Sequence, residues 1–303
     1  MRRVESASQV NDHVRTCQVS PPTVINEETK MKTDVKTISI QGPVAKLAAH
    51  VQGGAEAPAV VMSHSILSSS MMWDEQAELL VSRGWRVVRV DTRGHGGSQA
   101  SEPPYAFDDL GADVVAVMDA LQIKRAHYVG LSLGGMIGFG LGIHHANRWL
   151  SLCLCDTRAD APAAFAAPWE ERIAIAQQHG CRALAEPTTE RWFGKPFLEA
   201  HPEIARRFRA AAAATSIKGF VGCARAIQSL DYLPDVGRIT TPVTLIVGAN
   251  DGPLPQAMKD IRALIAGSVL EVIPGAGHLP NIDQPEAFNA ALVRHLGRLA
   301  TAG

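Results

Sequence analysis

A serine, an aspartate and a histidine occur in this chain in an order that suits nucleophilic acyl transfer. Ser132 lies in the segment Gly130–Gly134, Gly-Leu-Ser-Leu-Gly, between a short β-prone run and an apolar helical run. A strand-to-helix turn of this kind exposes the serine hydroxyl, and its glycines avoid collisions with neighbouring backbone. Asp251 and His278 follow later strands in glycine-rich turns. We therefore expect Ser132 to be the nucleophile, His278 its base and Asp251 the acid that orients the base.

The same chemistry needs backbone donors for the oxyanion that forms during attack. One expected donor is the N–H of Leu133, directly after the nucleophile, and the other is the N–H of Ile66, in the loop after the third strand. His64 precedes this loop and is expected to be structural, since the base must lie past the last strand. Asp156, just after the sixth strand, is an alternative candidate for the acid.

The charge and composition of the chain favour a small-molecule substrate over a macromolecular or membrane partner. The net charge is −1 and no Lys/Arg run exceeds two residues, so neither nucleic acid nor an anionic membrane is expected. The five cysteines are an odd number without a Cys-x-x-Cys pair, which indicates reduced thiols in a cytoplasmic protein. No signal-peptide pattern or membrane-spanning apolar run is present. His95 has no suitably spaced second ligand, so we expect no metal, while a homodimer stays open.

The elements that would position these residues alternate between strands and helices. Six β-prone runs are nearly continuously apolar, as expected of strands covered by helices on both faces. A leading hairpin precedes them. The pattern predicts an α/β fold with a mostly parallel, doubly wound sheet of eight strands. The expected strands are 36–40, 44–51, 59–63, 86–91, 126–130, 150–155, 243–248 and 270–273.

Residues 157–230 break this alternation because they contain helical stretches and no convincing strand. We expect them to form a cap over the carboxyl edge of the sheet, where open α/β sheets bind ligands. The core then comprises 31–156 and 231–303, and residues 1–30 form a disordered or extended segment. Trp192 and Phe193 of the cap are candidates for an apolar pocket wall, with simple core packing an equal alternative.

These landmarks together resemble the α/β-hydrolase superfamily, and more narrowly the 3-oxoadipate enol-lactonase group. The resemblance is carried by segments 91–98, 130–135, 190–193, 277–279 and 284–288 together with Asn281, and it extends over about residues 59–296. That group hydrolyses an enol-lactone in the bacterial breakdown of aromatic acids, without a cofactor. The resemblance therefore implies a cytoplasmic serine hydrolase that opens an ester or a lactone, with Ser132, Asp251 and His278 as its triad.

Two departures from the group bear on the substrate. The group usually has Asn-Ser-Leu-Gly-Thr after the third strand, where this chain has His-Ser-Ile-Leu-Ser at 64–68. It usually has Cys-Asn-Thr where this chain has Cys-Asp-Thr at 155–157, and the added charge of Asp156 is expected to disfavour a carboxylate-bearing substrate. The alternatives are a carboxylesterase or C–C bond hydrolase acting on another aromatic-derived compound, and a hydrolase-like ligand receptor without turnover.

Overall fold

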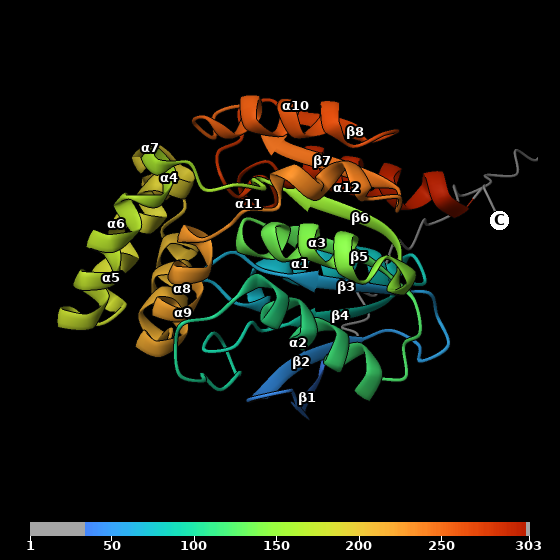
Figure 1. Ribbon diagram of the computed structural model, residues 1–303, viewed down its shortest axis with the longest axis horizontal. Helices are drawn as coiled ribbons and strands as arrows, with labels where there is room; N and C mark the ends of the chain where they lie inside the picture. Colours follow the sequence, from blue (N-terminus) through green and yellow to red (C-terminus); the bar gives the residue numbers. More distant parts are fainter. Residues whose placement is uncertain (1–33, 301–303) are drawn as a thin grey trace, which may run out of the picture. The chain divides into compact units, whose positions relative to one another are not determined.

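The protein is built around one eight-stranded sheet, shown in Figure 1. The computed structural model describes residues 34–300, so the expectation for residues 1–30 lies outside the described residues. The strand order is β1-β2-β4-β3-β5-β6-β7-β8, in which β1 and β2 pair antiparallel and all strands from β4 onward in this order pair in parallel. The predicted α/β sheet is confirmed. The strands are β1 (Lys36–Gln41), β2 (Lys46–Gln52), β3 (Ala59–Ser63), β4 (Arg86–Val90), β5 (Ala126–Leu131), β6 (Trp149–Cys155), β7 (Val243–Gly248) and β8 (Val269–Ile273).

The burial of most of these strands explains why their sequences are continuous apolar runs. Every residue of β3, β5 and β7 is buried, because helices cover both faces of the sheet. The prediction was wrong for β8, which is the last strand of the sheet and has only one residue in the buried class. Val272 is 48% exposed, and Glu271 instead pairs with two arginines of the last helix.

Helices connect the parallel strands and pack on the sheet. Those of the core are α1 (Asp74–Ser82), α2 (Phe107–Ala120), α3 (Leu133–His144), α10 (Leu254–Leu264), α11 (Pro280–Asp283) and α12 (Pro285–Ala300), with 3-10 turns η1 (Ser70–Trp73), η2 (Ala146–Arg148) and η3 (Leu233–Arg238). Among the described residues, no helix is both long and apolar enough to cross a membrane.

Six helices between β6 and β7 lie beyond the ends of the strands, at the left in Figure 1, and we call residues 163–228 the cap. They are α4 (Ala163–Ala166), α5 (Pro168–His179), α6 (Arg182–Phe193), α7 (Lys195–Ala200), α8 (Pro202–Ala214) and α9 (Ile217–Gln228). The strand arrows of β3, β6 and β7 point toward the cap, so it faces the carboxyl edge of the sheet.

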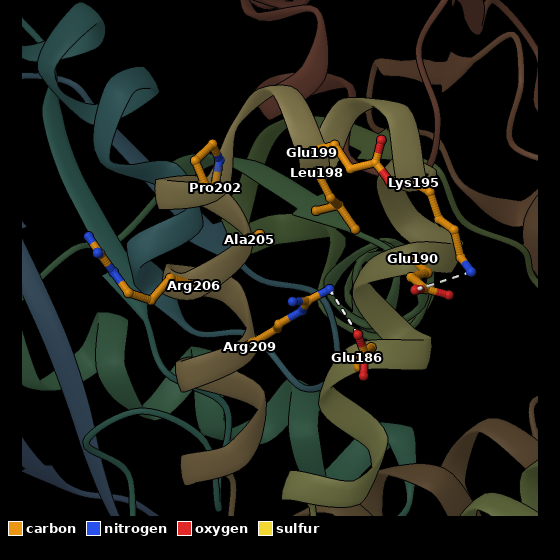
Figure 2. A pocket seen from close by; sticks show the side chains of 9 residues that line it. All are labelled: Glu186, Glu190, Lys195, Leu198, Glu199, Pro202, Ala205, Arg206 and Arg209. Carbon is orange, nitrogen blue, oxygen red and sulfur yellow. Dashed lines mark ion pairs between the residues drawn. The ribbon is translucent and has the colours of Figure 1, made fainter.

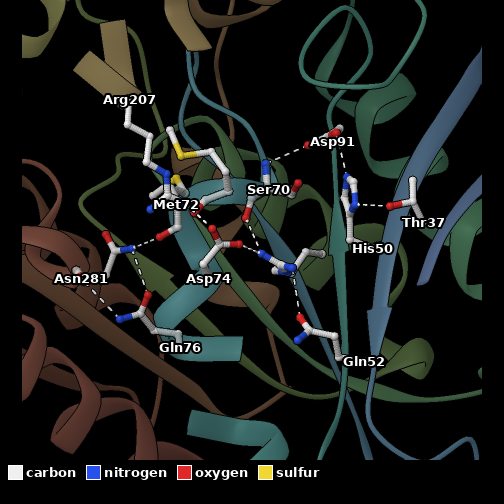
Figure 3. Close-up of polar contacts among 12 residues, drawn as sticks. Thr37, His50, Gln52, Ser70, Met72, Asp74, Gln76, Asp91, Arg207 and Asn281 are labelled. Carbon is white, nitrogen blue, oxygen red and sulfur yellow. Dashed lines mark hydrogen bonds and ion pairs between the residues drawn. The ribbon is translucent and has the colours of Figure 1, made fainter. Parts of the chain in front are cut away.

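Polar contacts hold the cap to the core. Figure 3 shows Arg207 of α8 next to Asp74 of α1, with which it forms an ion pair. Arg207 also donates a hydrogen bond of 2.7 Å to the Met71 carbonyl. Asp74 pairs with Arg89 of β4 as well, so one carboxylate joins a cap arginine to a core arginine. The cap is therefore fixed to the sheet edge on which the candidate site lies.

Candidate active site

Ser132 lies at a sharp turn between the last residue of β5 and the first residue of α3. Its backbone has φ 56° and ψ −112°, a conformation that non-glycine residues adopt only when the surroundings enforce it. A Cβ at Gly130 would lie 2.3 Å from the Gly134 carbonyl oxygen, and one at Gly134 would lie 2.4 Å from the Ser63 carbonyl oxygen. Both glycines are therefore required by close backbone packing, as expected from the sequence.

Sheet register brings the ends of neighbouring strands together at this turn. Leu131 of β5 pairs with Cys155 of β6, so Ser132 and Asp156 leave adjacent strands side by side. The Ser132 N–H donates to the Cys155 carbonyl at 2.9 Å. Asp251 follows β7 and His278 follows β8, the next two strands of the sheet. All four side chains thus belong to the carboxyl edge that the cap faces.

Asp251 and His278 are hydrogen-bonded. The distance from His278 Nδ1 to Asp251 Oδ2 is 2.7 Å. A carboxylate accepting from Nδ1–H leaves Nε2 as the basic nitrogen, which is the tautomer a serine hydrolase needs. No hydrogen bond joins Ser132 Oγ to the imidazole, and such bonds often tighten only when substrate binds. Of the two expected acids, Asp251 is the one that contacts His278.

The cap positions the histidine through Trp192. The His278 N–H donates to the Trp192 carbonyl at 3.0 Å, and the two rings are stacked with centroids 6.5 Å apart. Trp192 is 1% exposed and Phe193 is 9% exposed, and both rings contact Phe208. In this structure the two aromatic residues pack inside the cap, the second of the two alternatives, and a substrate contact by either stays a prediction.

The N–H groups of the two expected oxyanion donors have no hydrogen-bond partner within residues 34–300. Leu133 is the first residue of α3, where the helix supplies no acceptor for the N–H, and no hydrogen bond of the Ile66 N–H to the described residues is found. His64 braces the loop that carries Ile66. Its Nδ1 donates to the Ser65 carbonyl at 2.8 Å, and its Nε2 accepts from the Thr92 N–H at 2.9 Å. Burial lowers the pKa of His64, so the neutral ring holds this loop.

The 91–98 loop is a rigid support beside the site. Asp91 accepts hydrogen bonds from the N–H groups of Ser70 (2.7 Å) and Gly97 (2.8 Å), and its contact with His50 is visible in Figure 3. Burial alone would raise the pKa of Asp91, but His50 and these donors together lower it. Asp91 therefore stays charged and acts as a structural anchor.

Asp156 does not lie at the pocket edge, and this corrects the expectation of an added charge there. The side chain is fully buried, and its Oδ1 accepts from the Gly248 N–H at 2.8 Å. Burial and the nearby Asp251 carboxylate raise the pKa of Asp156 well above its usual value. Burial therefore favours the uncharged form of Asp156, which does not repel an anionic substrate.

Asp156, Asp251 and His278 also form the one group of potential metal ligands found among residues 34–298, with one atom of each within 4.8 Å of the others. Two features of the group suit a different role. His278 already directs Nδ1 at Asp251, and Asp156 favours its protonated form. The donor set therefore fits the orientation of an imidazole better than the binding of a cation.

Some recesses of the protein surface lie away from the Ser132 site. Figure 2 shows one of 580 Å³ on the cap between α6, α7 and α8. Its charged side chains largely pair with one another, Arg209 with Glu186 at 3.4 Å and Lys195 with Glu190 at 3.8 Å. None of its lining residues belongs to the Ser132 site. This recess therefore offers no nucleophile and few unpaired charges.

Comparison with known proteins identifies the family of this fold. A sequence model of the alpha/beta hydrolase fold matches residues 58–285. The chain belongs to the α/β-hydrolase family. This hydrolase is 35% identical over 241 residues to 3-oxoadipate enol-lactonase 2 of Acinetobacter baylyi, covering 79% of this chain and 89% of that protein.

Comparison with solved structures also finds hydrolases that are similar to this chain in fold and sequence. It resembles the enol-lactonase from Burkholderia xenovorans LB400 with a TM-score of 0.81 and 32% identity, over 86% of this chain and all of that one. A hydrolase from Pseudomonas aeruginosa PA01 gives a TM-score of 0.81 and 36% identity, over 87% and 98% of the two chains. The predicted membership of the α/β hydrolases, near the enol-lactonases, is confirmed.

Proposed function

We propose that this hydrolase opens a carboxylic ester or lactone through a serine acyl-enzyme. The observation that carries the proposal is the 2.7 Å contact between His278 and Asp251 at the sheet edge on which the Ser132 turn lies. The relatives named 3-oxoadipate enol-lactonase favour a lactone over an open ester. No cofactor takes part in this mechanism.

The first half-reaction forms the acyl-enzyme. His278 Nε2 removes the proton from Ser132 Oγ while Oγ attacks the substrate carbonyl carbon. The carbonyl oxygen becomes an oxyanion, which accepts hydrogen bonds from the N–H groups of Leu133 and Ile66. Collapse of the tetrahedral intermediate breaks the C–O bond, and the imidazolium returns its proton to the departing oxygen. In a lactone this oxygen stays attached to the acyl group.

The second half-reaction releases the acid. His278 removes a proton from water as the water oxygen attacks the acyl carbon, and the same two N–H groups bind the second oxyanion. The Ser132–acyl bond breaks and Ser132 Oγ recovers its proton from the imidazolium. Asp251 stays ionised throughout and stabilises the imidazolium through Nδ1–H.

A chromogenic ester and a covalent probe test the nucleophile. The parent is expected to hydrolyse 4-nitrophenyl acetate and to be labelled on Ser132 by a fluorophosphonate. Ser132→Ala should abolish both, whereas Ser82→Ala, at an exposed position on α1, should change neither. A folded parent with no turnover and no labelling would refute the enzyme, and an active Ser132→Ala variant would refute the nucleophile.

A screen of lactones and open esters tests the substrate class. We expect the lactones to give the higher kcat/KM, with the enol-lactone among them. Carbamates belong in the same screen, since a protein named putative carbamate hydrolase RutD from Variovorax paradoxus is 27% identical over 267 residues. Preference for open esters would support the carboxylesterase alternative.

A further inference from the structure

Asn281 forms a buried polar bridge from α11 to η1 and α1. Its side chain is 0% exposed, and its Nδ2 donates hydrogen bonds to the Met72 carbonyl at 2.8 Å and to Gln76 Oε1 at 3.3 Å, as Figure 3 shows. Gln76 returns a hydrogen bond of 3.1 Å from its Nε2 to the Asn281 carbonyl. The donor end of the Asn281 amide therefore faces two acceptors, and these contacts hold α11 against η1 and α1.

On the α11 side, the bridge acts on the segment that carries His278. We call residues 274–279, between β8 and α11, the histidine loop. Asp283 of α11 accepts a hydrogen bond of 2.6 Å from the Gly277 N–H, and the Asp283 N–H donates to the Leu279 carbonyl at 3.1 Å. The histidine loop and α11 are thus tied into one unit, so a shift of α11 would move His278 as well.

On the other side, the bridge acts on the segment that carries Ile66. We call residues 64–69, between β3 and η1, the oxyanion loop. Ser65 directly precedes Ile66, and its N–H donates to Met72 Sδ at 3.3 Å. Met72 is therefore held through its carbonyl by Asn281, and through its side chain it contacts the backbone of the oxyanion loop.

A second contact joins η1 to the start of the oxyanion loop. Trp73 follows Met72 and is 0% exposed, and its indole N–H donates to the Ser63 carbonyl at 3.2 Å. Ser63 is the last residue of β3, directly before the oxyanion loop. Two neighbouring residues of η1 thus contact the backbone at this loop, so a displacement of η1 would be transmitted to it.

We propose that Asn281 is a positioning residue that sets, through Met72, the spacing between His278 and the Ile66 N–H. This inference rests on the proposed ester or lactone hydrolysis and adds a residue that aligns its groups. The nucleophile and the first oxyanion donor share one turn, whereas the base and the second donor belong to separate loops. All of them act together in the transition state, where a misplacement of about 1 Å can cost about 100-fold in rate.

Asn281→Leu tests the inference because it keeps the approximate shape of the side chain and removes the donor. With 4-nitrophenyl acetate, kcat should fall by about 10- to 100-fold while KM stays within about twofold of the parent, since both half-reactions use the same groups. Phenylboronic acid, whose tetrahedral adduct with Ser132 imitates the oxyanion, should lose affinity by a similar factor. A merely structural side chain would lower the amount of folded protein and leave kcat per fluorophosphonate-labelled Ser132 unchanged.

Two further variants locate the effect. Asn289→Leu, on α12, is the matched control, because it removes the 2.9 Å hydrogen bond from Gln76 Nε2 and leaves both contacts of Asn281 Nδ2 in place. Its kcat should stay within about twofold of the parent. Met72→Leu removes the Sδ acceptor and should lower kcat. Combined with Asn281→Leu, it should cost less than the product of the two single effects, because both changes interrupt one path.

The outcomes separate this inference from the proposed function. Ser132-dependent turnover with an unchanged kcat in Asn281→Leu would overturn the positioning role alone. If the parent turns over no ester, hydrogen exchange of the full chain decides. Faster exchange across residues 64–72 in Asn281→Leu, but not in Asn289→Leu, would support the bridge, and equal exchange in the two variants would overturn it.

Discussion

Asp156 and Asp251 form a pair of carboxyl groups beside His278, and burial of Asp156 favours its protonated form. Asp251 accepts the hydrogen bond from the imidazole at 2.7 Å. Asp156 is fully buried, its Oδ2 has no partner that is a hydrogen-bond donor, and burial with the Asp251 charge raises its pKa. Two carboxyl groups this close share the cost of ionisation, so one stays protonated. The protonated Asp156 then has a hydroxyl that can donate to Asp251.

Asp156→Asn should stabilise the protein at high pH. The raised pKa means that the folded chain keeps a proton which the unfolded chain releases above about pH 4, so stability falls as the pH rises beyond that value. Asparagine keeps an acceptor for the Gly248 N–H and a donor toward Asp251, without the titration. We expect a gain of more than about 1 kcal/mol in the free energy of unfolding at pH 8, shrinking toward pH 4.

Urea unfolding at several pH values measures this gain. Asp156→Ala is the matched control, because it removes the acceptor of the Gly248 N–H and should destabilise the protein at every pH. Asp260→Asn, at an exposed position on α10, should show neither effect. A gain for Asp156→Asn that did not vary with pH would contradict a protonated Asp156.

Asp251→Asn should separate the two candidate acids by activity. An amide at position 251 favours the wrong tautomer of His278 and leaves the imidazolium without its counter-charge, so kcat should fall by about 10³- to 10⁴-fold with little change in KM. Asp156→Asn should retain most of the activity at pH 7. Steady-state kinetics on one neutral ester decide between them, and the reverse ranking would make Asp156 the acid.

Much of this site could be predicted because its residues belong to short, recognisable sequence segments. Gly130, Gly134 and Ser132 define a turn whose geometry is set within a few residues. Asp251 and His278 follow strands whose order in the sheet is limited by the rules of parallel connection. The fold itself followed from the alternation of apolar runs, since strands covered on both faces need them.

The remaining features depend on contacts between distant segments. The apolar pattern of β8 did not show that it is the edge strand, with Val272 half exposed. Asp156 is buried beside Gly248 and Asp251, which raises its pKa and disfavours the charge that the sequence led us to expect at the pocket edge. Arg172 of α5 and Thr188 of α6 lie on separate helices, and only cap packing brings them into hydrogen-bond contact. None of these is visible in a local pattern of residue types.

Gly134→Ala should disrupt the nucleophile turn. The new Cβ would lie 2.4 Å from the Ser63 carbonyl oxygen, so β3 and α3 must separate, and Ser132 loses its position. We expect a loss of about 1–3 kcal/mol in the free energy of unfolding and a fall in kcat of more than about 100-fold. Chemical unfolding and ester turnover measure the two effects.

Gly297→Ala is the control for that change. Gly297 lies in α12, and no atom lies within 4 Å of an added Cβ. Alanine there should raise stability by about 0.5–1 kcal/mol and leave turnover unchanged, as alanine generally does in a helix interior. If both variants behaved alike, the backbone contact at Gly134 would not be the cause.

Arg207→Gln should loosen the cap without changing the chemical step. Arg207 joins α8 to Asp74 and to the Met71 carbonyl, beside the helix whose Phe208 packs on Trp192. Its side chain is 47% exposed, so the stability loss should not exceed about 1 kcal/mol. Local opening of the cap should increase, and hydrogen exchange across Pro202–Ala214 should therefore be faster than in the parent. KM should rise while kcat is retained.

Arg206→Gln is the matched control, because Arg206 is the neighbouring residue and is exposed. Its exchange and kinetics should be those of the parent. Equal exchange in the two variants would mean that the Asp74 contact does not hold the cap.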